Sequence, residues 1–233
     1  MVFFTLPWPN YHTHYLTLTQ LLFPRWRLNP VVRLILLNLR PLKQNDIPQI
    51  ARFHSLYIPH STFAQLGIPF LKTLYQSFLK PRCGFVYTYW EGGKMQGFIA
   101  GATDSQHLLR SLFLRHFLFL LVISLKALFR HPRFFSLLFQ TFQYPKKVDL
   151  PQTKAELLFI AVKPENRGRG IGSKLILKSL EELKKRGIDG VKVSVEKKNR
   201  GAINLLRKMH FSQERNFSFY HRERILFSYW IPK

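Results

Sequence analysis

The sequence LLFIAVKPENRGRGIGS, from Leu157 to Ser173, decides the fold of this chain. Its first six residues are apolar, which is typical of a buried strand, and Pro164 ends that strand. A glycine-rich turn follows, and apolar residues at helical spacing then predict a helix that ends at Gly187. A strand, a turn and a helix N-terminus in this order gather free backbone N–H groups around one point, which suits a phosphate or diphosphate. The stretch therefore predicts an anionic cofactor.

The glycine spacing disfavours two common nucleotide sites. The glycines stand at 168, 170 and 172, whereas a dinucleotide-binding turn needs Gly-x-Gly-x-x-Gly and an acidic residue about 20 positions later. A Walker loop needs Gly-x-x-x-x-Gly-Lys-Ser/Thr, and no glycine pair here has that register. Binding of a nucleoside triphosphate is therefore not expected.

Residues Arg167–Gly172 instead form the pattern Arg-x-x-Gly-x-Gly. Between a strand and a helix, this pattern resembles the pyrophosphate loop of the GCN5-related N-acetyltransferase (GNAT) family. The resemblance continues downstream, where Val191–Val195 reads as the next strand. Residues Asn199–Phe211 are then similar to the family's Asn-x-x-Ala-x-x-Leu-Tyr-x-x-x-Gly-Phe, with Leu206 in place of the tyrosine and His210 in place of the glycine.

The resemblance implies a fold, an activity and a cofactor. The implied fold is α/β (α+β), with a central, mixed but mostly antiparallel, twisted sheet flanked by helices. The strand before the loop would part from its neighbour to admit the cofactor. The implied activity is transfer of an acetyl group from acetyl-CoA to a primary amine of a small-molecule, nucleotide-linked or lipid-linked acceptor. The residues implied to bind acetyl-CoA are Ile160, Ala161, Val162, Arg167, Gly168, Arg169, Gly170, Ile171, Gly172, Ser173 and Asn199.

The resemblance also suggests catalytic and acceptor residues. Glu156, on the strand before the loop, is the expected general base, which would accept the amine proton directly or through water. The family's usual general acid is the tyrosine that Leu206 replaces, and leucine cannot donate a proton, so the general acid is left open. His210 would either bend its turn or place an imidazole near the cleft. The acceptor-side candidates are His54, Tyr57 and His60.

Alternation of side chains and turn signals predict the remaining strands. The glycine pair after Glu91 predicts a tight hairpin. The expected strands are Val31–Leu39, Phe85–Trp90, Gln96–Thr103, Glu214–Tyr220 and Ile225–Trp230. The last two would form a terminal hairpin, from which Tyr220, Arg222 and Tyr229 either reach the cleft or lie in the surface or core.

Helix signals precede the first hairpin. Asn45-Asp46 before Ile47-Pro48 predicts a helix that runs to about Tyr57. Ser61 or Thr62 is expected to cap a further turn, and a helix restarts at Gly67-Ile68-Pro69. Its apolar face would carry Phe70, Leu71, Leu74, Phe78 and Leu79.

The chain is strongly basic, with 36 Lys and Arg against 12 Asp and Glu and a formal net charge of +24. Such a field attracts anionic membranes, nucleic acid, phosphorylated cofactors and acidic acceptors alike. The single cysteine, Cys83, can form no internal disulfide, which suits a cytoplasmic protein. The nine histidines show no His-x-x-x-His spacing with a glutamate partner, so no metal site is expected.

The expected organisation is an N-terminal arm at 1–30 and a transferase domain at 31–233 that is interrupted by a helical insertion at 105–148. The arm would either pack on the domain or anchor at a membrane interface. The longest uncharged run of the insertion, His116–Leu125, has ten residues, whereas a membrane-spanning helix needs about 20. The insertion would therefore cover the sheet, form a homodimer interface or lie in the plane of an anionic membrane.

Two other functions stay open. A CoA-binding module without turnover is favoured slightly by Leu206, and a basic adaptor for membrane or nucleic acid is suggested by the charge and by the insertion. An amine acceptor is the main expected partner, and nucleic acid is the less favoured one.

Overall fold

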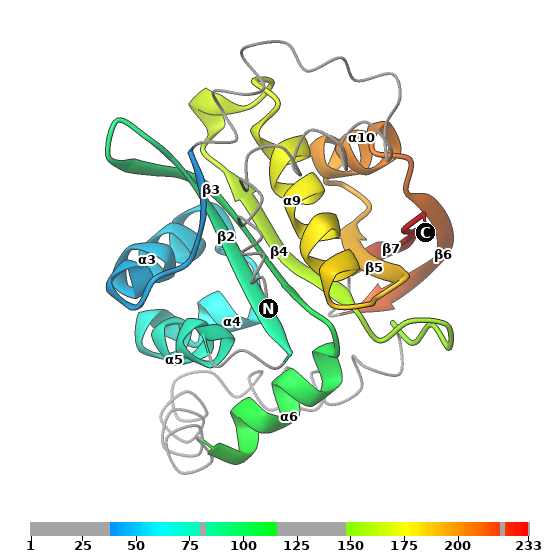
Figure 1. Cartoon of the computed structure of the whole chain (residues 1–233), viewed down its shortest axis with the longest axis horizontal. Helices are drawn as coiled ribbons and strands as arrows, with labels where there is room; N and C mark the ends of the chain where they lie inside the picture. Colours follow the sequence, from blue (N-terminus) through cyan, green and yellow to red (C-terminus); the bar gives the residue numbers. More distant parts are fainter. Residues whose placement is uncertain (1–37, 80–82, 116–147, 220–221, 233) are drawn as a thin grey trace, which may run out of the picture. The chain divides into compact units, whose positions relative to one another are not determined.

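A computed structural model describes residues 38–79, 83–115, 148–219 and 222–232 (Figure 1). In this part of the chain the strands form one seven-stranded sheet in the order β1-β2-β3-β4-β5-β7-β6. All neighbouring strands are antiparallel except β4 and β5, which are parallel. The strands are β1 (Leu39–Pro41), β2 (Gly84–Glu91), β3 (Lys94–Ala102), β4 (Glu156–Val162), β5 (Gly190–Glu196), β6 (Ser212–Phe219) and β7 (Arg222–Trp230).

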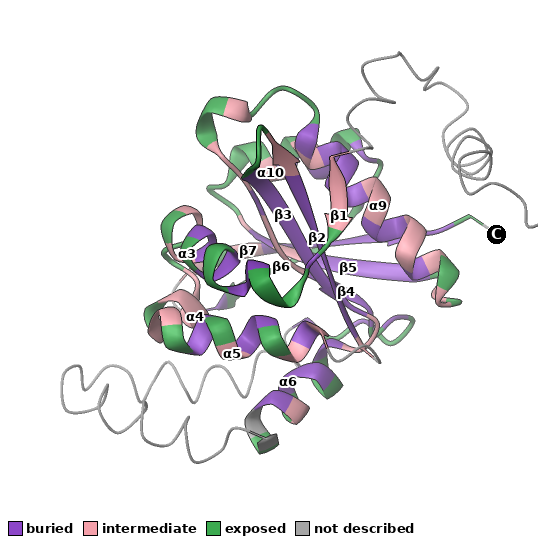
Figure 2. Cartoon of the chain, turned by 60° about the vertical axis from the view of Figure 1, so that its left-hand side comes forward, coloured by how far each residue is buried: buried purple, intermediate pink, exposed green. Residues whose placement is uncertain are grey.

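Helices cover both faces of the sheet (Figure 2). The described helices are η1 (Gln44–Asp46), α3 (Ile47–Tyr57), α4 (Thr62–Gln65), α5 (Gly67–Leu79), α6 (Ser105–Arg115), η2 (Pro164–Asn166), α9 (Ile171–Lys185) and α10 (Arg200–Lys208). Phe98 and Ala100 of β3 belong to the apolar cluster that α3 and α5 build. Gly97 precedes Phe98, so a side chain at Gly97 would point to the opposite face of the sheet. Ile171, at the start of α9, lies against that face. Alternation along β3 therefore separates the α3 and α5 layer from the α9 layer.

The expected mixed, mostly antiparallel sheet flanked by helices is confirmed, and so are most of its elements. The helix to Tyr57, the capped turn after Ser61 and the hairpin around Gly92-Gly93 lie as the sequence predicts. Buried side chains of α5 include Phe70, Leu71, Leu74 and Phe78 from its expected apolar face.

Some predictions fall on residues outside the described ranges. The first strand is described only as Leu39–Pro41, and the rest of the expected Val31–Leu39 strand lies outside them, as does the arm at 1–30. Of the insertion, α6 is described, whereas the expected second helix lies outside. Among the described residues, no helix is both long and apolar enough to cross a membrane. The proposals of membrane contact and of a homodimer therefore stay predictions.

Helix α10 ends in a turn that explains one departure from the family pattern. His210 has φ of 61°, in the left-handed region that glycine adopts most readily. Its N–H donates to the carbonyl of Arg207 at 3.0 Å, and the N–H of Phe211 donates to the carbonyl of Leu206 at 3.0 Å. This pair of hydrogen bonds is the Schellman arrangement. The side chains of Leu206 and Phe211 are both buried, as that motif favours. His210 therefore supplies a helix stop, and its imidazole is exposed.

Replacing His210 with glycine is expected to stabilise the fold, because a residue with a Cβ atom is strained in the left-handed region by about 1 kcal/mol. The gain would appear as a higher free energy of unfolding in urea. His210→Ala is the matched control, since alanine keeps the Cβ atom and removes the imidazole. Equal stability of the wild type and both variants would contradict the strain.

Candidate active site

Strands β4 and β5 pair over only two positions and then part. Glu156 lies opposite Lys192 and Leu157 opposite Val193, after which no pairing follows although both strands continue. The register between β3 and β4 shifts at Leu158, which is one extra residue in β4. Such a bulge bends the strand that carries it and re-aims its remainder. The bulge accounts for the turn of β4 away from β5, and the expected parting of these strands is confirmed.

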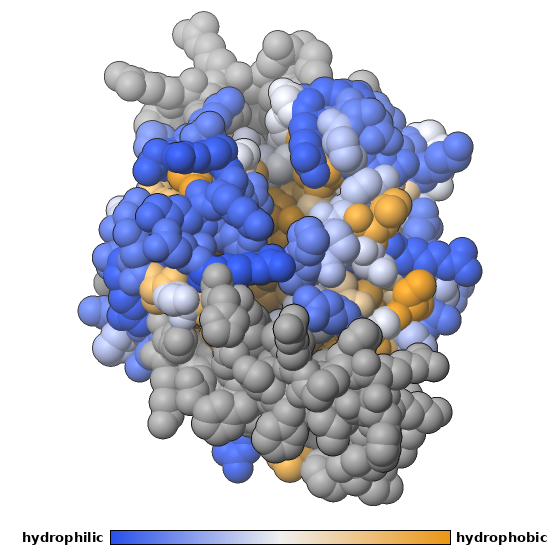
Figure 3. Space-filling model, turned by 180° about the vertical axis from the view of Figure 1, so that it is seen from behind, coloured by the Kyte–Doolittle hydropathy of each residue, from blue (hydrophilic) through white to orange (hydrophobic). Residues whose placement is uncertain are grey.

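A cavity of about 420 Å³ occupies the opening. Residues 158–160 of β4 are only partly buried although β4 is a central strand, because the cavity lies beside them. Figure 3 shows a hollow with an apolar floor and hydrophilic side chains around it. The cavity is lined by the connection from α3 to α4, by β4 and β5, by one side of α10, and by residues of β6 and β7.

The glycine-rich loop lies between the end of β4 and the start of α9. Gly168 and Gly170 both have φ of 78°, which only glycine adopts without strain. Among the described residues, no N–H group from Gly168 to Ser173 donates a hydrogen bond. These amides and the positive end of the α9 dipole lie at one point, an arrangement that suits an anion. The loop thus has the geometry that the sequence predicts for a diphosphate.

The two arginines of the loop have different surroundings. Arg169 donates to both carboxylate oxygens of Glu91, at 3.0 and 2.7 Å, and to the amide oxygen of Asn166 at 2.5 Å. These bonds fix the loop against the end of β2, and they partly compensate the charge of Arg169. Arg167 donates from Nε to the carbonyl of Val162 at 3.2 Å and is exposed. Arg167 is therefore the less compensated arginine beside the loop.

Lys174 adds a cation that sequence reasoning did not select. Its ammonium would lie 3.9 Å from a Cβ atom at Gly170. The side chain is buried, and its pKa is lowered first by that burial and second by the nearby charge of Arg169. An anion at the loop would favour the charged form of Lys174 and so would be bound more tightly.

Asn199 has a clear structural role at the cavity. Its side-chain oxygen accepts from the N–H of Ala202 at 3.1 Å and so caps the N-terminus of α10. The residue also lines the cavity. With Oδ1 used by the cap, its NH₂ group is the part of the side chain that can reach a ligand.

The three acceptor-side candidates separate into two groups. Tyr57 and His60 line the cavity. His54 is fully buried instead, among rings that include Phe98 and Phe159. This apolar burial lowers the pKa of His54 to about 3, so the imidazole is neutral at physiological pH.

His54 connects the core to the cavity wall through two hydrogen bonds. Its Nδ1 lies 2.6 Å from the hydroxyl of Tyr75, and its Nε2 lies 2.8 Å from Oγ of Ser61. The hydroxyl of Tyr75 is fully buried, and among the described residues only His54 offers it an acceptor. A buried donor needs an acceptor, so Tyr75 donates to Nδ1 and the ring proton is on Nε2.

This tautomer determines what Ser61 can offer a substrate. Oγ of Ser61 accepts from Nε2 of His54 and, at 3.0 Å, from the N–H of Ala64. Both acceptor positions of the hydroxyl are then used, and its own proton remains to be donated. Ser61 lines the cavity, so this proton can reach a bound molecule. The sequence selected Ser61 only as a helix cap.

Glu156 does not lie where a general base is needed. It is 1% exposed, at the paired end of β4 beside the equally buried Lys192, and it is not among the residues that line the cavity. The strand enters the opening only after Leu157, because the bulge comes at Leu158. The position of Glu156 therefore does not support the predicted role.

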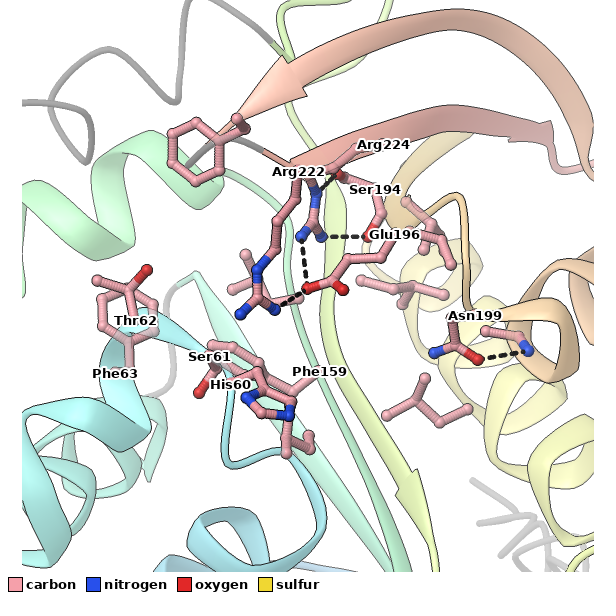
Figure 4. Close-up of a pocket in the computed structure, with 18 of the residues that line it drawn as sticks. His60, Ser61, Thr62, Phe63, Phe159, Ser194, Glu196, Asn199, Arg222 and Arg224 are labelled. Carbon is pink, nitrogen blue, oxygen red and sulfur yellow. Dashed lines mark hydrogen bonds and ion pairs between the residues drawn. The ribbon is translucent and has the colours of Figure 1, made fainter. Parts of the chain in front are cut away.

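Glu196 is the carboxylate that the structure places at the cavity (Figure 4). It ends β5, directly opposite Arg224 of β7. Its Oε1 accepts from Nη1 of Arg222 at 2.7 Å and lies 3.8 Å from Nη1 of Arg224. The sequence signal that could have identified Glu196 is the strict alternation of β5, which places Ser194 and Glu196 on the same face of the sheet.

The acetyltransferase (GNAT) family model matches residues 50–211, which is more than half of the 233 residues. The chain therefore belongs to the GNAT family of acetyltransferases. The match includes the parted strands, the loop and the helix that Asn199 caps.

Individual relatives agree with this assignment. A segment of 60 residues is 43% identical to an uncharacterized N-acetyltransferase of Methanocaldococcus jannaschii, and it spans 26% of this chain and 26% of that protein. The structure of an N-acetyltransferase from Staphylococcus aureus matches with a TM-score of 0.55 and 15% identity, over 83% of this chain and 98% of that one. The Salmonella typhimurium protein yncA, solved with its cofactor acetyl-CoA, has a TM-score of 0.55 and 11% identity, over 84% and 94% of the two chains. At these identities the two structures show the fold alone.

The buried His54 is expected to make the fold acid-sensitive. Its pKa is about 3 in the folded chain against 6.5 as the ordinary value. Below pH 6.5 the unfolded chain takes up a proton that the folded chain does not, so stability is lost as the pH falls from 6.5 toward 3. The loss between pH 7 and pH 5 from this group is roughly 2 kcal/mol.

Urea unfolding of wild type and His54→Gln at pH 7 and pH 5 measures this contribution. Glutamine can still bond to Tyr75 and Ser61 but does not titrate. The difference between the two pH values should be smaller in the variant by roughly 2 kcal/mol. An unchanged difference would mean that His54 takes up a proton as readily in the folded chain as in the unfolded chain.

Proposed function

We propose that this protein transfers an acetyl group from acetyl-CoA to the primary amine of a small-molecule, nucleotide-linked or lipid-linked acceptor. The observation that carries the proposal is the opening between β4 and β5, which begins after Leu157 and lies beside a loop of unbonded amides. The opening exposes a strand edge to a thioester arm, and the loop suits a diphosphate. The yncA protein of similar fold holds acetyl-CoA.

The chain's own groups fit this donor. Bound acetyl-CoA supplies an activated acetyl thioester. The open edge of β4 offers backbone groups of the segment Ile160–Val162 to the pantetheine arm, from alternate residues only, because the others bond to β3. An N–H group of this edge can polarise the thioester carbonyl. The amides from Gly168 to Ser173, with the charge of Arg167, suit the diphosphate. Asn199 offers its NH₂ group from the side of α10.

Glu196 is the proposed proton acceptor. A protonated amine cannot attack a carbonyl, so a group at the cavity must take its proton. Both arginine contacts of Glu196 are made to Oε1, and among the described residues none donates a hydrogen bond to Oε2. Oε2 is therefore available to the acceptor amine or to a water molecule that relays the proton.

Ser61 is the proposed hydrogen-bond donor to the departing sulfur or to the carbonyl oxygen. Leu206, which replaces the family's tyrosine, is 4% exposed and lines the cavity with an aliphatic side chain. The hydroxyl proton of Ser61 is directed by the fixed tautomer of His54. Ser61→Ala should therefore lower kcat and leave the Kd of acetyl-CoA unchanged.

Leu206 also supports the second candidate function, a CoA-binding module without turnover. Release of free CoA thiol in the presence of amines distinguishes the two. An enzyme releases thiol in proportion to acetylated amine, whereas a module binds CoA and releases none above the rate of the buffer.

Replacing Gly170 with valine tests the cofactor loop. A β-branched residue cannot adopt φ of 78° without strain, so the amides would turn away from the diphosphate. The Kd of acetyl-CoA, measured by calorimetry, should rise at least about tenfold. Gly187→Val is the matched control, because Gly187 has φ of 70° at the other end of α9. If Gly170→Val binds acetyl-CoA as wild type does, the loop is not the diphosphate site.

Glu196→Gln tests the proton acceptor. Loss of a general base should lower kcat by about 100-fold near neutral pH, with the Kd of acetyl-CoA unchanged. Part of the activity should return at high pH, where more of the amine is already deprotonated. Glu165→Gln, at an exposed carboxylate outside the cavity, is the control. A normal kcat in Glu196→Gln would assign the base elsewhere.

A further inference from the structure

The charged groups of the cavity wall are few and unequal in number. Apart from His60, the charged residues that line it within the described part of the chain are Glu196, Arg222 and Arg224. In this described lining, one carboxylate thus faces two guanidinium groups, which leaves one surplus positive charge. The three side chains are partly enclosed, with 21% of Glu196, 31% of Arg222 and 21% of Arg224 exposed. A partly enclosed charge that lacks a counterion favours an anionic ligand.

Arg224 is held in a fixed orientation. Its Nε donates to Oγ of Ser194 at 2.7 Å, and its Nη2 donates to the carbonyl of Ser194 at 2.9 Å. Both acceptors are neutral, so they orient the guanidinium without compensating its charge (Figure 4). Its Nη1 is the nitrogen nearest the carboxylate, at 3.8 Å from Glu196. A guanidinium fixed before binding loses less conformational entropy when it takes up an anion.

Arg222 has donors to spare. Its Nη1 donates to Oε1 of Glu196 at 2.7 Å, and its other nitrogens have no acceptor among the described residues. A guanidinium presents five N–H donors in a planar fork that matches carboxylate and phosphate groups. Arg222 can therefore hold Glu196 and a ligand anion at the same time.

A second hollow adjoins the main cavity. Its volume is about 370 Å³, and it shares Arg222 and Glu196 with the main cavity. Its lining adds Lys197, Lys198, Arg200 and Glu223, so cations outnumber carboxylates by four to two. Lys197 is paired with Glu223 at 2.8 Å, whereas Lys198 and Arg200 have no such partner in the described part of the chain. The surplus of positive charge thus extends on both sides of Arg222.

We propose that the acceptor is a primary amine that also carries a carboxylate or phosphate group, which Arg222 and Arg224 bind while the amine lies at Glu196. The inference rests on the proposed acetyl transfer and names the acceptor class of that same site. A simple amine would bring a positive charge to a wall that already has a positive surplus. An anionic group on the same molecule compensates the surplus and directs the amine toward the single carboxylate.

Matched pairs of amines test the proposal with the whole 233-residue chain. The pairs are β-alanine with β-alanine amide, and phosphoethanolamine with ethanolamine, which separate carboxylate from phosphate. At equal concentrations of the neutral amine form, thiol release should give a kcat/KM at least about tenfold higher for the anionic member of one pair. The preference should shrink as salt is added, because exposed charges are screened. Equal values within both pairs would overturn the proposal.

Arginine variants locate the preference. Arg222→Gln and Arg224→Gln should each lose most of the preference while the Kd of acetyl-CoA stays as in wild type, and Arg222→Lys should retain part of it. Arg207→Gln, which removes one exposed positive charge from α10, is the control for net charge and should leave the preference intact. Circular dichroism and the Tm of each variant check folding. A preference that survives both glutamine variants, or a raised Kd of acetyl-CoA in either, would contradict the assigned role.

Binding separates this inference from the proposed function. With the protein saturated with CoA, calorimetry of each amine needs no turnover. Tighter binding of anionic amines that is lost in Arg222→Gln would support the anion site even if no thiol were released. The absence of thiol release would then refute only acetyl transfer. Thiol release with equal binding of both members of each pair would refute only the anionic acceptor.

Discussion

The early separation of β4 from β5 is the constraint on which the rest of the structure depends. Parallel neighbours in a sheet normally exchange hydrogen bonds along their whole length, and unpaired buried amides each cost about 1–3 kcal/mol. Here the ladder ends after Leu157, yet β4 stays in place because β3 pairs with it as far as Val162. One edge of β4 is thus held and the other is open. The open edge needs water or a ligand, and the cavity of the proposed site lies beside it.

Side chains at this opening are held by partners from other elements. His54 of α3 is bonded to Tyr75 of α5 and fixes Ser61 at the start of α4. Arg224 of β7 is held by Ser194 of β5. Groups that are oriented before a ligand arrives need no reorganisation when charge develops, which is the main source of electrostatic catalysis. The cavity therefore has an apolar floor, and the polar side chains around it are held in fixed orientations.

Two of the few carboxylates of this basic chain position arginines around the proposed site. Glu91 draws Arg169 and the loop toward β2, and Glu196 draws Arg222 toward the cavity. With 12 acidic residues in all, most of the positive charge stays uncompensated and acts at long range, which suits anionic ligands in general. The local pairs decide where an anion can bind, because a Coulomb interaction between exposed charges is screened within about 10 Å.

Periodicity and turn signals in the sequence were enough to predict the helix from Ile47 to Tyr57, the hairpin around Gly92 and the glycine-rich loop. The GNAT assignment rested on the resemblance of that loop to the family's pattern, and the family match over residues 50–211 bears it out. These features are local, since alternation, caps and left-handed glycines act within a few residues. Only the tertiary structure decided that Leu158 forms a bulge, that Glu156 is enclosed beside Lys192, and that Glu196, Ser61 and Arg224 meet at one cavity. These residues come from distant parts of the chain, and a sequence pattern cannot show which carboxylate faces the opening until strand register and bulge position fix the direction of each side chain.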